Sequence, residues 1–195
     1  MKLLVATTNA NKISEIRLAL EGVACEVVTL ADVGRVPEPD ESGATFWENA
    51  RIKALAYTEA TGLTAVAEDS GFVIDALGGE PGVRSARFLG PAATYADRFA
   101  EIYRRLAGRP SSARFVTALA LAQGPDILFE TEATIEGVVS AAPAGSNGFG
   151  YDPIFFYPPF RTTTAQMSAA QKTSVSHRAR AFRDLGRFLA AGARR

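Results

Sequence analysis

The chain has 195 residues, of which 47% are hydrophobic and 22% charged, a balance that predicts a single domain, with room for two lobes, over residues 1–195. Lysine plus arginine and aspartate plus glutamate number 21 each, so no net positive charge attracts nucleic acid. No stretch approaches the ~18 apolar residues that span a bilayer, and the run at residues 1–6 is too short for a signal peptide. The single Cys25 predicts a buried, inert thiol. We therefore expect a cytoplasmic protein without a membrane partner.

Apolar runs and helical stripes alternate along the chain and predict a mixture of strands and helices. Strands are expected at residues 3–6, 23–30, 63–67, 72–74, 114–123 and 127–139, and near Ile154. Helices are expected from the loop 7–12 to Gly22, and over residues 45–61, 94–106 and 178–189. Thr45 and Glu48 match a capping box. Residues 68–71 match a turn, which predicts that Glu68 and Asp69 lie at a strand end.

The polar loop 7–12 lies between a predicted strand and a predicted helix. Backbone N–H groups and the positive end of a helix dipole bind anions at such a junction, and Lys12 adds a mobile positive charge. The glycine spacing of a P-loop is missing. Either a phosphate site or a polar turn with a helix cap fits these residues.

Carboxylates are frequent around the predicted third strand. Glu68 and Asp69 adjoin it, and Asp40, Glu41 and Glu48 precede it. Such oxygen ligands suit Mg²⁺, which takes one or two carboxylates, several waters and phosphate oxygens. A carboxylate that the metal does not fully engage could polarise a water. Helix capping and solvation are the alternative, most of all for Glu48 and least for Asp69.

Lys172, His177 and Arg178 form a basic cluster before the last predicted helix, which Ser176 can cap. The two cations could hold phosphate while His177 contacts a base edge or a phosphate. A structural role for this lone histidine is the alternative. One histidine and one cysteine argue against a zinc site, and no Gly-x-Ser-x-Gly elbow indicates a serine hydrolase.

Residues 145–153 read Gly-Ser-Asn-Gly-Phe-Gly-Tyr-Asp-Pro. Glycines let a backbone approach a ligand closely, Phe149 and Tyr151 offer flat faces, and Asp152 offers an acceptor. This combination suits a planar heterocycle. A glycine-rich turn with its aromatic rings buried in the core is the alternative.

Taken in order, these clusters resemble the inosine triphosphate pyrophosphatase family, also called XTP/dITP diphosphatases, over nearly the whole chain. The resemblance rests on residues 6–12 (Ala-Thr-Thr-Asn-Ala-Asn-Lys), 41–50 (Glu-Ser-Gly-Ala-Thr-Phe-Trp-Glu-Asn-Ala), 68–71 (Glu-Asp-Ser-Gly), 148–153 (Gly-Phe-Gly-Tyr-Asp-Pro) and 176–178 (Ser-His-Arg). It implies an α/β fold with a mixed central sheet flanked by helices and two lobes around a nucleotide-binding cleft, usually as a homodimer. It also implies hydrolysis of non-standard purine nucleoside triphosphates (ITP, dITP, XTP) to the nucleoside monophosphate and pyrophosphate, which cleanses the nucleotide pool.

Carried over residue by residue, the resemblance implies that Asp69 is the catalytic proton acceptor and a Mg²⁺ ligand, with Glu41 and Glu68 as the other candidate ligands. The implied substrate-binding residues are Thr7, Thr8, Asn9, Ala10, Asn11, Lys12, Ser70, Phe149, Gly150, Tyr151, Asp152, Lys172, His177 and Arg178. Residues 7–12 would contact the triphosphate, and residues 149–152 and 177–178 would lie near the base. Two positions depart from the family pattern: Asn147, where many relatives have glycine, and Gln171, where an acidic residue often precedes the lysine.

The expected mechanism follows from the chemistry of these groups. Asp69, directly or through the hydration shell of the metal, activates a water that attacks the α-phosphorus. Pyrophosphate then leaves with its charge held by Mg²⁺, Lys12 and Lys172. A site built for a 6-oxo acceptor leaves the 6-amino group of adenine unpaired, which favours hypoxanthine and xanthine.

Three other functions fit part of the sequence. A pyrophosphatase for modified or pyrimidine triphosphates is disfavoured by the glycine-rich segment and the Ser-His-Arg motif. A non-catalytic nucleotide sensor would gain nothing from Glu68 and Asp69 beside phosphates. An RNA-binding module would need a basic surface and stacking strands, which the neutral composition disfavours.

Overall fold

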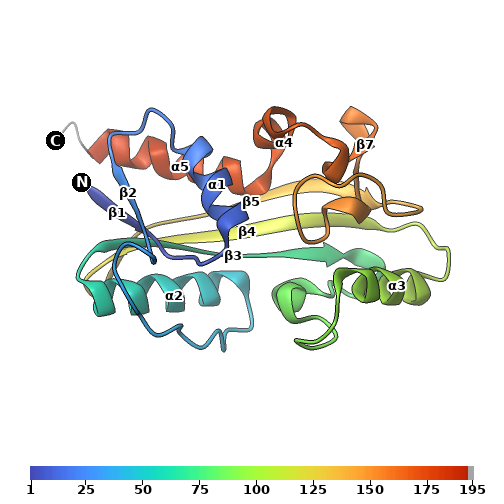
Figure 1. Cartoon of the computed structure of the whole chain (residues 1–195), viewed down its shortest axis with the longest axis horizontal. Helices are drawn as coiled ribbons and strands as arrows, with labels where there is room; N and C mark the ends of the chain where they lie inside the picture. Colours follow the sequence, from blue (N-terminus) through green and yellow to red (C-terminus); the bar gives the residue numbers. More distant parts are fainter. Residues whose placement is uncertain (193–195) are drawn as a thin grey trace. The chain divides into compact units, whose positions relative to one another are not determined.

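The computed structural model describes residues 1–192 and divides the chain into two compact units. Unit 1 contains Met1–Asp69, Thr117–Ala133 and the described residues from His177 onward, and unit 2 contains Ser70–Val116 and Thr134–Ser176. Both units are discontinuous because long strands run from one into the other (Figure 1). A single domain over residues 1–195 stays a prediction, and residues 193–195 lie outside the described part.

One seven-stranded sheet has the order β2-β1-β3-β4-β5-β6-β7. Its strands are β1 (Lys2–Val5), β2 (Glu26–Thr29), β3 (Thr64–Ile74), β4 (Ser112–Gln123), β5 (Asp126–Val139), β6 (Phe155–Tyr157) and β7 (Thr162–Thr163). Strand β1 pairs in parallel with β2 and β3, whereas β6 pairs antiparallel with β5 and β7. The mixed sheet expected from the sequence is confirmed, while the nucleotide-binding cleft stays a prediction.

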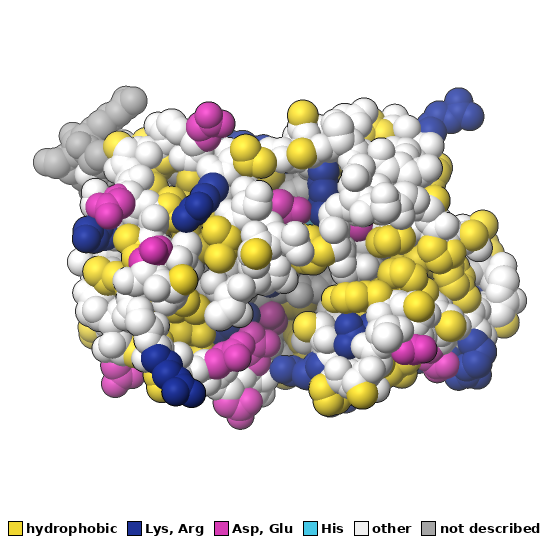
Figure 2. All heavy atoms as spheres, in the orientation of Figure 1, with side chains coloured by type: hydrophobic (Ala, Val, Ile, Leu, Met, Phe, Trp, Pro, Cys, Tyr) yellow, Lys and Arg dark blue, Asp and Glu magenta, His cyan; other side chains and the backbone are white. Residues whose placement is uncertain are grey.

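The helices are α1 (Ala10–Ala19), α2 (Phe46–Thr61), α3 (Tyr95–Leu106), α4 (Ala169–Val175) and α5 (His177–Gly192). All except α4 are at predicted positions. Helix α4 spans only seven residues and buries only Val175, so it shows no apolar periodicity that a sequence pattern could reveal. Within residues 1–192, no helix is both long and apolar enough to cross a membrane. On the face seen in Figure 2, basic side chains are scattered among acidic ones.

Helices cover both faces of the sheet in unit 1. Side chains of α2 pack with Leu4, Ala65 and Ala67, whereas side chains of α1 and α5 pack with Leu3 and Val66. Consecutive strand residues point to opposite faces, which explains this division. Figure 1 shows α2 on one side of β1 and β3 and α1 with α5 on the other. Position 68 on β3 therefore faces α1 and α5, and position 69 faces α2.

Strand β3 runs without interruption from Thr64 to Ile74. The predicted turn at residues 68–71, with separate strands on either side, is therefore wrong, and Glu68 and Asp69 lie in the middle of the strand. Both are buried, at 4% and 6% exposed. Buried carboxylates require charged or hydrogen-bonding partners, and here these partners come from residues remote in the sequence. A local sequence pattern could not indicate them.

The predicted capping box at the start of α2 is confirmed. Thr45 Oγ1 accepts a hydrogen bond from the N–H of Glu48 at 3.2 Å, and Glu48 Oε2 accepts from the N–H groups of Thr45 and Ala44 at 3.1 and 2.7 Å. We expect Thr45→Ala to lower the free energy of unfolding by ~1 kcal/mol in urea titrations, because one backbone donor loses its acceptor. Glu59→Ala, at an exposed position of the same helix, should change it by less than ~0.5 kcal/mol. Equal effects of the two substitutions would contradict this assignment.

Candidate active site

The polar loop after β1 builds the first turn of α1. Asn9 Oδ1 accepts hydrogen bonds from the N–H groups of Asn11 and Lys12 at 3.0 and 3.3 Å, and Thr7 Oγ1 accepts from the N–H of Asn9 at 3.2 Å. The side chains of Thr7 and Asn9 thus shape the loop, and the helix cap considered from the sequence is present. The other predicted residues here, Thr8, Ala10 and Asn11, are exposed.

Lys12 lies against Glu68 in unit 1. Its ammonium is 3.3 Å from Glu68 Oε1, and its side chain is 19% exposed. Burial lowers the pKa of Lys12, against the opposing effect of Glu68. The first turn of α1 therefore places a cation beside the acidic stretch of β3, where an anionic ligand would meet fixed positive charge.

Glu68 is held on the α1–α5 face of the sheet by several donors. Arg178 Nε donates to Glu68 Oε1 at 2.6 Å, and Thr117 Oγ1 donates to Oε2 at 3.1 Å. A second nitrogen of Arg178 donates to Glu15 on α1 at 2.5 Å. Burial alone raises the pKa of Glu68, but Arg178 and Lys12 outweigh it and hold the pKa well below the usual range. Glu68 is therefore an ionised member of a buried charge network.

Asp69 faces the opposite side of the sheet, toward α2. Its Oδ2 accepts a hydrogen bond from Asn49 Nδ2 at 3.1 Å, and its Oδ1 lies 3.3 Å from Lys53 Nζ. Burial raises the pKa of Asp69, against the opposing effects of Lys53 and Asn49. A buried carboxyl with a raised pKa beside a fixed cation is suited to accept a proton during a reaction.

Glu41 and Asp69 both face the same ammonium group. Lys53 Nζ lies 2.8 Å from Glu41 Oε1 and 3.3 Å from Asp69 Oδ1, so two hard oxygen ligands converge on one cationic position. Because each carboxylate keeps further lone pairs, the pair can also hold Mg²⁺ beside this ammonium, since the ion needs only one or two protein carboxylates. Among residues 1–192, no group of three or more His, Cys, Asp and Glu side chains is placed to hold a metal ion. The three-carboxylate set that includes Glu68 stays a prediction.

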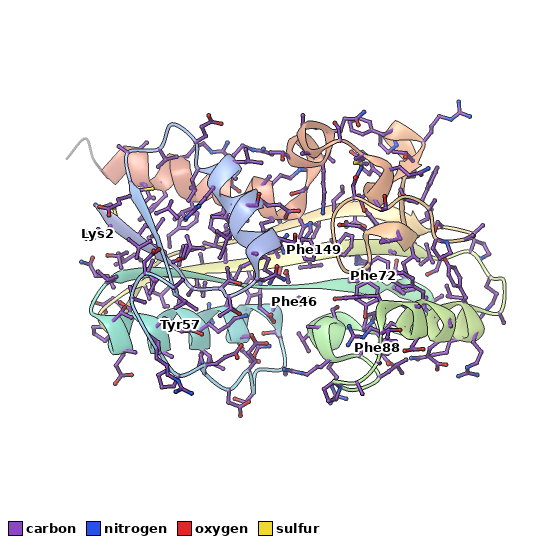
Figure 3. The ribbon with its side chains drawn as sticks, viewed as in Figure 1. Lys2, Phe46, Tyr57, Phe72, Phe88 and Phe149 are labelled. Carbon is purple, nitrogen blue, oxygen red and sulfur yellow. The ribbon has the colours of Figure 1, made fainter. Side chains whose placement is uncertain are left out.

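In unit 2, the glycine-rich segment is organised around Asp152. Asp152 Oδ2 accepts from the N–H of Phe149 at 2.8 Å and from Lys172 Nζ at 2.6 Å, and Oδ1 accepts from Thr164 Oγ1 at 2.8 Å. The Lys172 ammonium lies 5.0 Å from the centroid of the Phe149 ring, which Figure 3 labels in the loop between β5 and β6. Gly148 adopts φ +73°, and a Cβ there would lie 2.1 Å from Asp152 Oδ2. The segment thus joins Phe149, Asp152 and Lys172 into one cluster.

Tyr151 belongs to the core of unit 2. Its side chain is 3% exposed and stacks on Phe72 with ring centroids 5.1 Å apart, and its hydroxyl donates to the backbone oxygen of Ser85 at 2.9 Å. Figure 3 labels Phe72 on β3 and Phe88, both members of the same core. The ring of Tyr151 is therefore packed as in the alternative considered from the sequence, and any contact of this residue with a ligand stays a prediction.

The two departures from the family pattern have structural roles. Gln171 Oε1 accepts from the N–H of Ser168 at 2.9 Å and completes the capping box of α4, a role that the carboxylate of an acidic residue can also fill. Asn147 Nδ2 donates to the backbone oxygen of Met167 at 3.0 Å and ties the glycine-rich segment to the stretch before α4. Both side chains support the segment that carries Lys172.

The predicted site residues are divided between the units. Residues 7–12, Glu41, Glu68, Asp69, His177 and Arg178 lie in unit 1, and Ser70, residues 149–152 and Lys172 lie in unit 2. His177, 6% exposed, begins α5, and Ser70 on β3 is half-buried. Each predicted role of these residues in binding stays a prediction.

Sequence reasoning missed Asn49, Lys53 and Glu15, which contact the predicted carboxylates and Arg178. Asn49 and Lys53 lie four residues apart on α2, at the spacing of one helical turn. Two polar residues at this spacing among the apolar ones of a buried helical face were the signal that could have identified them. Glu15, on the partly polar helix α1, gave no comparable signal.

Comparisons with known proteins identify the relatives of this chain. A model of the Ham1 family matches residues 3–188. The dITP/XTP pyrophosphatase of Syntrophobacter fumaroxidans is 46% identical over 188 residues, covering 95% of this chain and 80% of that protein. A dITP/XTP pyrophosphatase of Thermus thermophilus is 44% identical over 190 residues, covering 95% and 90%. The solved structure of a HAM1 protein from Coxiella burnetii matches with a TM-score of 0.90 and 34% identity, covering 98% and 99% of the two chains.

Proposed function

Because this chain belongs to the Ham1 family, we propose that it hydrolyses dITP, XTP and ITP to the nucleoside monophosphate and pyrophosphate. The names of its relatives support this substrate class. The observation that carries the chemistry is Asp69, a buried carboxylate with a raised pKa that shares the Lys53 ammonium with Glu41. Cleavage of these nucleotides would keep them out of nucleic acids, which cleanses the nucleotide pool.

The groups in unit 1 divide the chemical tasks of this proposal, and Asp69 has two of them. Mg²⁺, held by Glu41 and Asp69 when bound, would neutralise phosphate oxygens and stabilise the leaving pyrophosphate. Asp69 accepts the proton of the water that attacks the α-phosphorus. Lys53 and Lys12 supply fixed positive charge, and the first turn of α1 offers its dipole to the phosphates. Asp69, rather than Glu68, takes the proton, because Arg178 and Lys12 hold the pKa of Glu68 low.

The cluster of Phe149, Asp152 and Lys172 in unit 2 is the proposed base-recognition group. Phe149 supplies an aromatic face. Because the ammonium of Lys172 lies against this ring, we now assign it to the base rather than to the leaving pyrophosphate, as a donor suited to the 6-oxo group of hypoxanthine or xanthine. The 6-amino group of adenine is itself a hydrogen-bond donor and could not pair with the Lys172 ammonium, which disfavours ATP. Asp152 keeps Phe149 and Lys172 in place, because its Oδ2 accepts hydrogen bonds from the backbone N–H of Phe149 and from the Lys172 ammonium.

A product assay tests the proposal. The protein is incubated with Mg²⁺ and equal concentrations of dITP, XTP, ITP, ATP or GTP, and pyrophosphate and orthophosphate are measured separately. We expect pyrophosphate and monophosphate in equal amounts, with dITP, XTP and ITP cleaved faster than ATP and GTP. Orthophosphate as the product, or equal rates for all bases, would refute the proposal. Binding without turnover would instead identify a nucleotide sensor.

Two further assignments accompany the proposal. A nucleotide-pool enzyme acts where nucleotides are made and used, so we place it in the cytoplasm. The homodimer implied by the sequence resemblance is also proposed, and sedimentation analysis of the purified protein measures it. A monomer at micromolar concentration would refute the dimer without affecting the proposed reaction.

We expect Gly148→Ala to lower kcat/KM for dITP by about tenfold or more, a loss of ~1.4 kcal/mol in transition-state stabilisation. The added Cβ would lie 2.1 Å from Asp152 Oδ2 and 3.0 Å from Lys172 Nζ, so the cluster must rearrange. The matched control is Gly124→Ala. Gly124 also has positive φ, at +56°, but no atom lies within 4 Å of the added Cβ. The control should lower stability and leave kcat/KM unchanged; equal kinetic losses would exclude a specific role for the cluster.

A further inference from the structure

We infer that Asn49 is a positioning residue, which holds the Asp69 carboxylate and the loop segment 40–43 in one fixed arrangement. The inference rests on the proposed function, in which Asp69 accepts the proton. The side chain of Asn49 is fully buried, at 0% exposed, on α2. It touches the reaction only through Asp69, so it is distinct from the residues that would contact the substrate.

Both ends of the Asn49 amide are used, and their orientation is fixed. The N–H of Gly43 is a donor, so the atom that meets it at 2.8 Å must be the acceptor Oδ1. The other end, Nδ2, therefore points to Asp69 Oδ2 and donates to it at 3.1 Å. A flipped amide would place donor against donor and acceptor against acceptor. Asn49 thereby fixes the rotation of the Asp69 carboxylate from the side opposite Lys53.

The backbone at Gly43 is shaped to meet this amide. A Cβ at position 43 would lie 2.7 Å from Asn49 Oδ1 and 2.7 Å from Glu48 Cβ. Any side chain here would push the loop away from α2 and lengthen the bond between Gly43 and Asn49. Glycine is needed at this position for close approach of the backbone to the helix.

Asn49 and Lys53 together close a ring of contacts. Asn49 joins Gly43 to Asp69, and Lys53, one turn further along α2, joins Glu41 to the same carboxylate. Glu41 and Gly43 of the loop segment are therefore both fixed to α2 and, through it, to Asp69 on β3. Such a support sets the direction of a catalytic carboxylate before substrate arrives. This pre-organisation lowers the free energy of the transition state more than it strengthens substrate binding.

Kinetics of Asn49→Leu test the inference. We expect kcat for dITP to fall about 100-fold, because a small displacement of a reacting group is costly, while KM stays near the wild-type value. In an Asp69→Asn background, the same substitution should lower the residual turnover no further, because Asn49 acts only through Asp69. The matched control, Thr58→Val, removes the 2.5 Å hydrogen bond from another buried residue of α2 to Leu63 O, and should change neither constant. A wild-type kcat in Asn49→Leu, or a further loss of about 100-fold in the Asp69→Asn background, would overturn the inference.

Hydrogen exchange gives a readout that does not require activity. In Asn49→Leu and in Gly43→Ala, amides of residues 40–45 should exchange faster than in wild type, whereas Thr58→Val should leave them unchanged. Unchanged protection of residues 40–45 in both variants would overturn the inference even if the enzyme is active. If the wild-type protein released no pyrophosphate, the proposed function would fail, and exchange would still decide whether Asn49 holds the loop. Gly43→Ala keeps the test available if Asn49→Leu does not fold.

Discussion

Asp69→Asn is expected to lower kcat for dITP hydrolysis by about 10²- to 10⁴-fold, because an amide cannot accept the proton of the attacking water. The substitution keeps the size of the side chain, and Lys53 keeps Glu41 as its partner, so the fold should persist although the amide N–H₂ group would face Asn49 or Lys53, which are donors themselves. Nucleotide binding should also persist, since Lys12 and the cap of α1 are unaltered. Steady-state kinetics and equilibrium titration with ITP measure the two properties separately.

Asp32→Asn is the matched control for this experiment. Asp32 also lies in unit 1 and also accepts hydrogen bonds, from the backbone and hydroxyl of Thr29 at 2.8 and 2.7 Å, but it is exposed and lies outside the charge clusters. The kcat of the Asp32→Asn variant should match that of the wild type. Near-normal turnover in Asp69→Asn would remove Asp69 as the proton acceptor, and a loss of nucleotide binding equal to the loss of turnover would point to a structural role.

Arg178→Met should be the most destabilising of the substitutions considered. Arg178 is 2% exposed, and its guanidinium pairs with both Glu15 and Glu68. Removing one partner of a buried ion pair leaves an uncompensated buried charge, which typically costs ~3–5 kcal/mol. Lys12 and Thr117 remain beside Glu68 and place the expected loss at the lower end of that range. Denaturant unfolding monitored by circular dichroism measures it.

Arg187→Met provides the comparison on the same helix. Arg187 pairs with Asp184, but its side chain is 78% exposed, so this surface ion pair should contribute less than ~1 kcal/mol. Similar losses in the two variants would show that the Arg178 network is no more important for stability than a surface contact. A loss of activity in Arg178→Met without a loss of stability would instead support direct contact of Arg178 with substrate.

Local signals were sufficient to predict most of the fold. Thr45 with Glu48, and the apolar stripe of α3 after Thr94, specify helix starts through contacts within a few residues. The continuity of β3 was not predictable in this way. The local sequence pattern at Glu68 and Asp69 resembles that of a polar turn. In the folded chain Arg178 and Lys53, which lie on other elements, neutralise the two carboxylates, and the strand continues through both positions. Tertiary contacts therefore decide this part of the structure against its local pattern.

Sequence motifs point to candidate residues for the site but not to the contacts that hold them. The motifs identified Lys12, Asp69 and Asp152, whose residue types suit phosphate, water and base. They did not indicate that Asn49 supports Asp69, because the spacing of Asn49 and Lys53 shows only that two polar residues share a buried helical face, not which residue they contact. They also left the place of the Tyr151 ring open, since aromatic residues suit a core and a ligand site equally well.

Attack of water on the α-phosphorus of the nucleotide is the step on which the proposed reaction depends, and isotope labelling reveals it. dITP is hydrolysed by the protein in H₂¹⁸O with Mg²⁺, and the products are separated and analysed by mass spectrometry. We expect ¹⁸O in the nucleoside monophosphate and none in the pyrophosphate. Label in the pyrophosphate, or in orthophosphate, would contradict attack at the α-phosphorus.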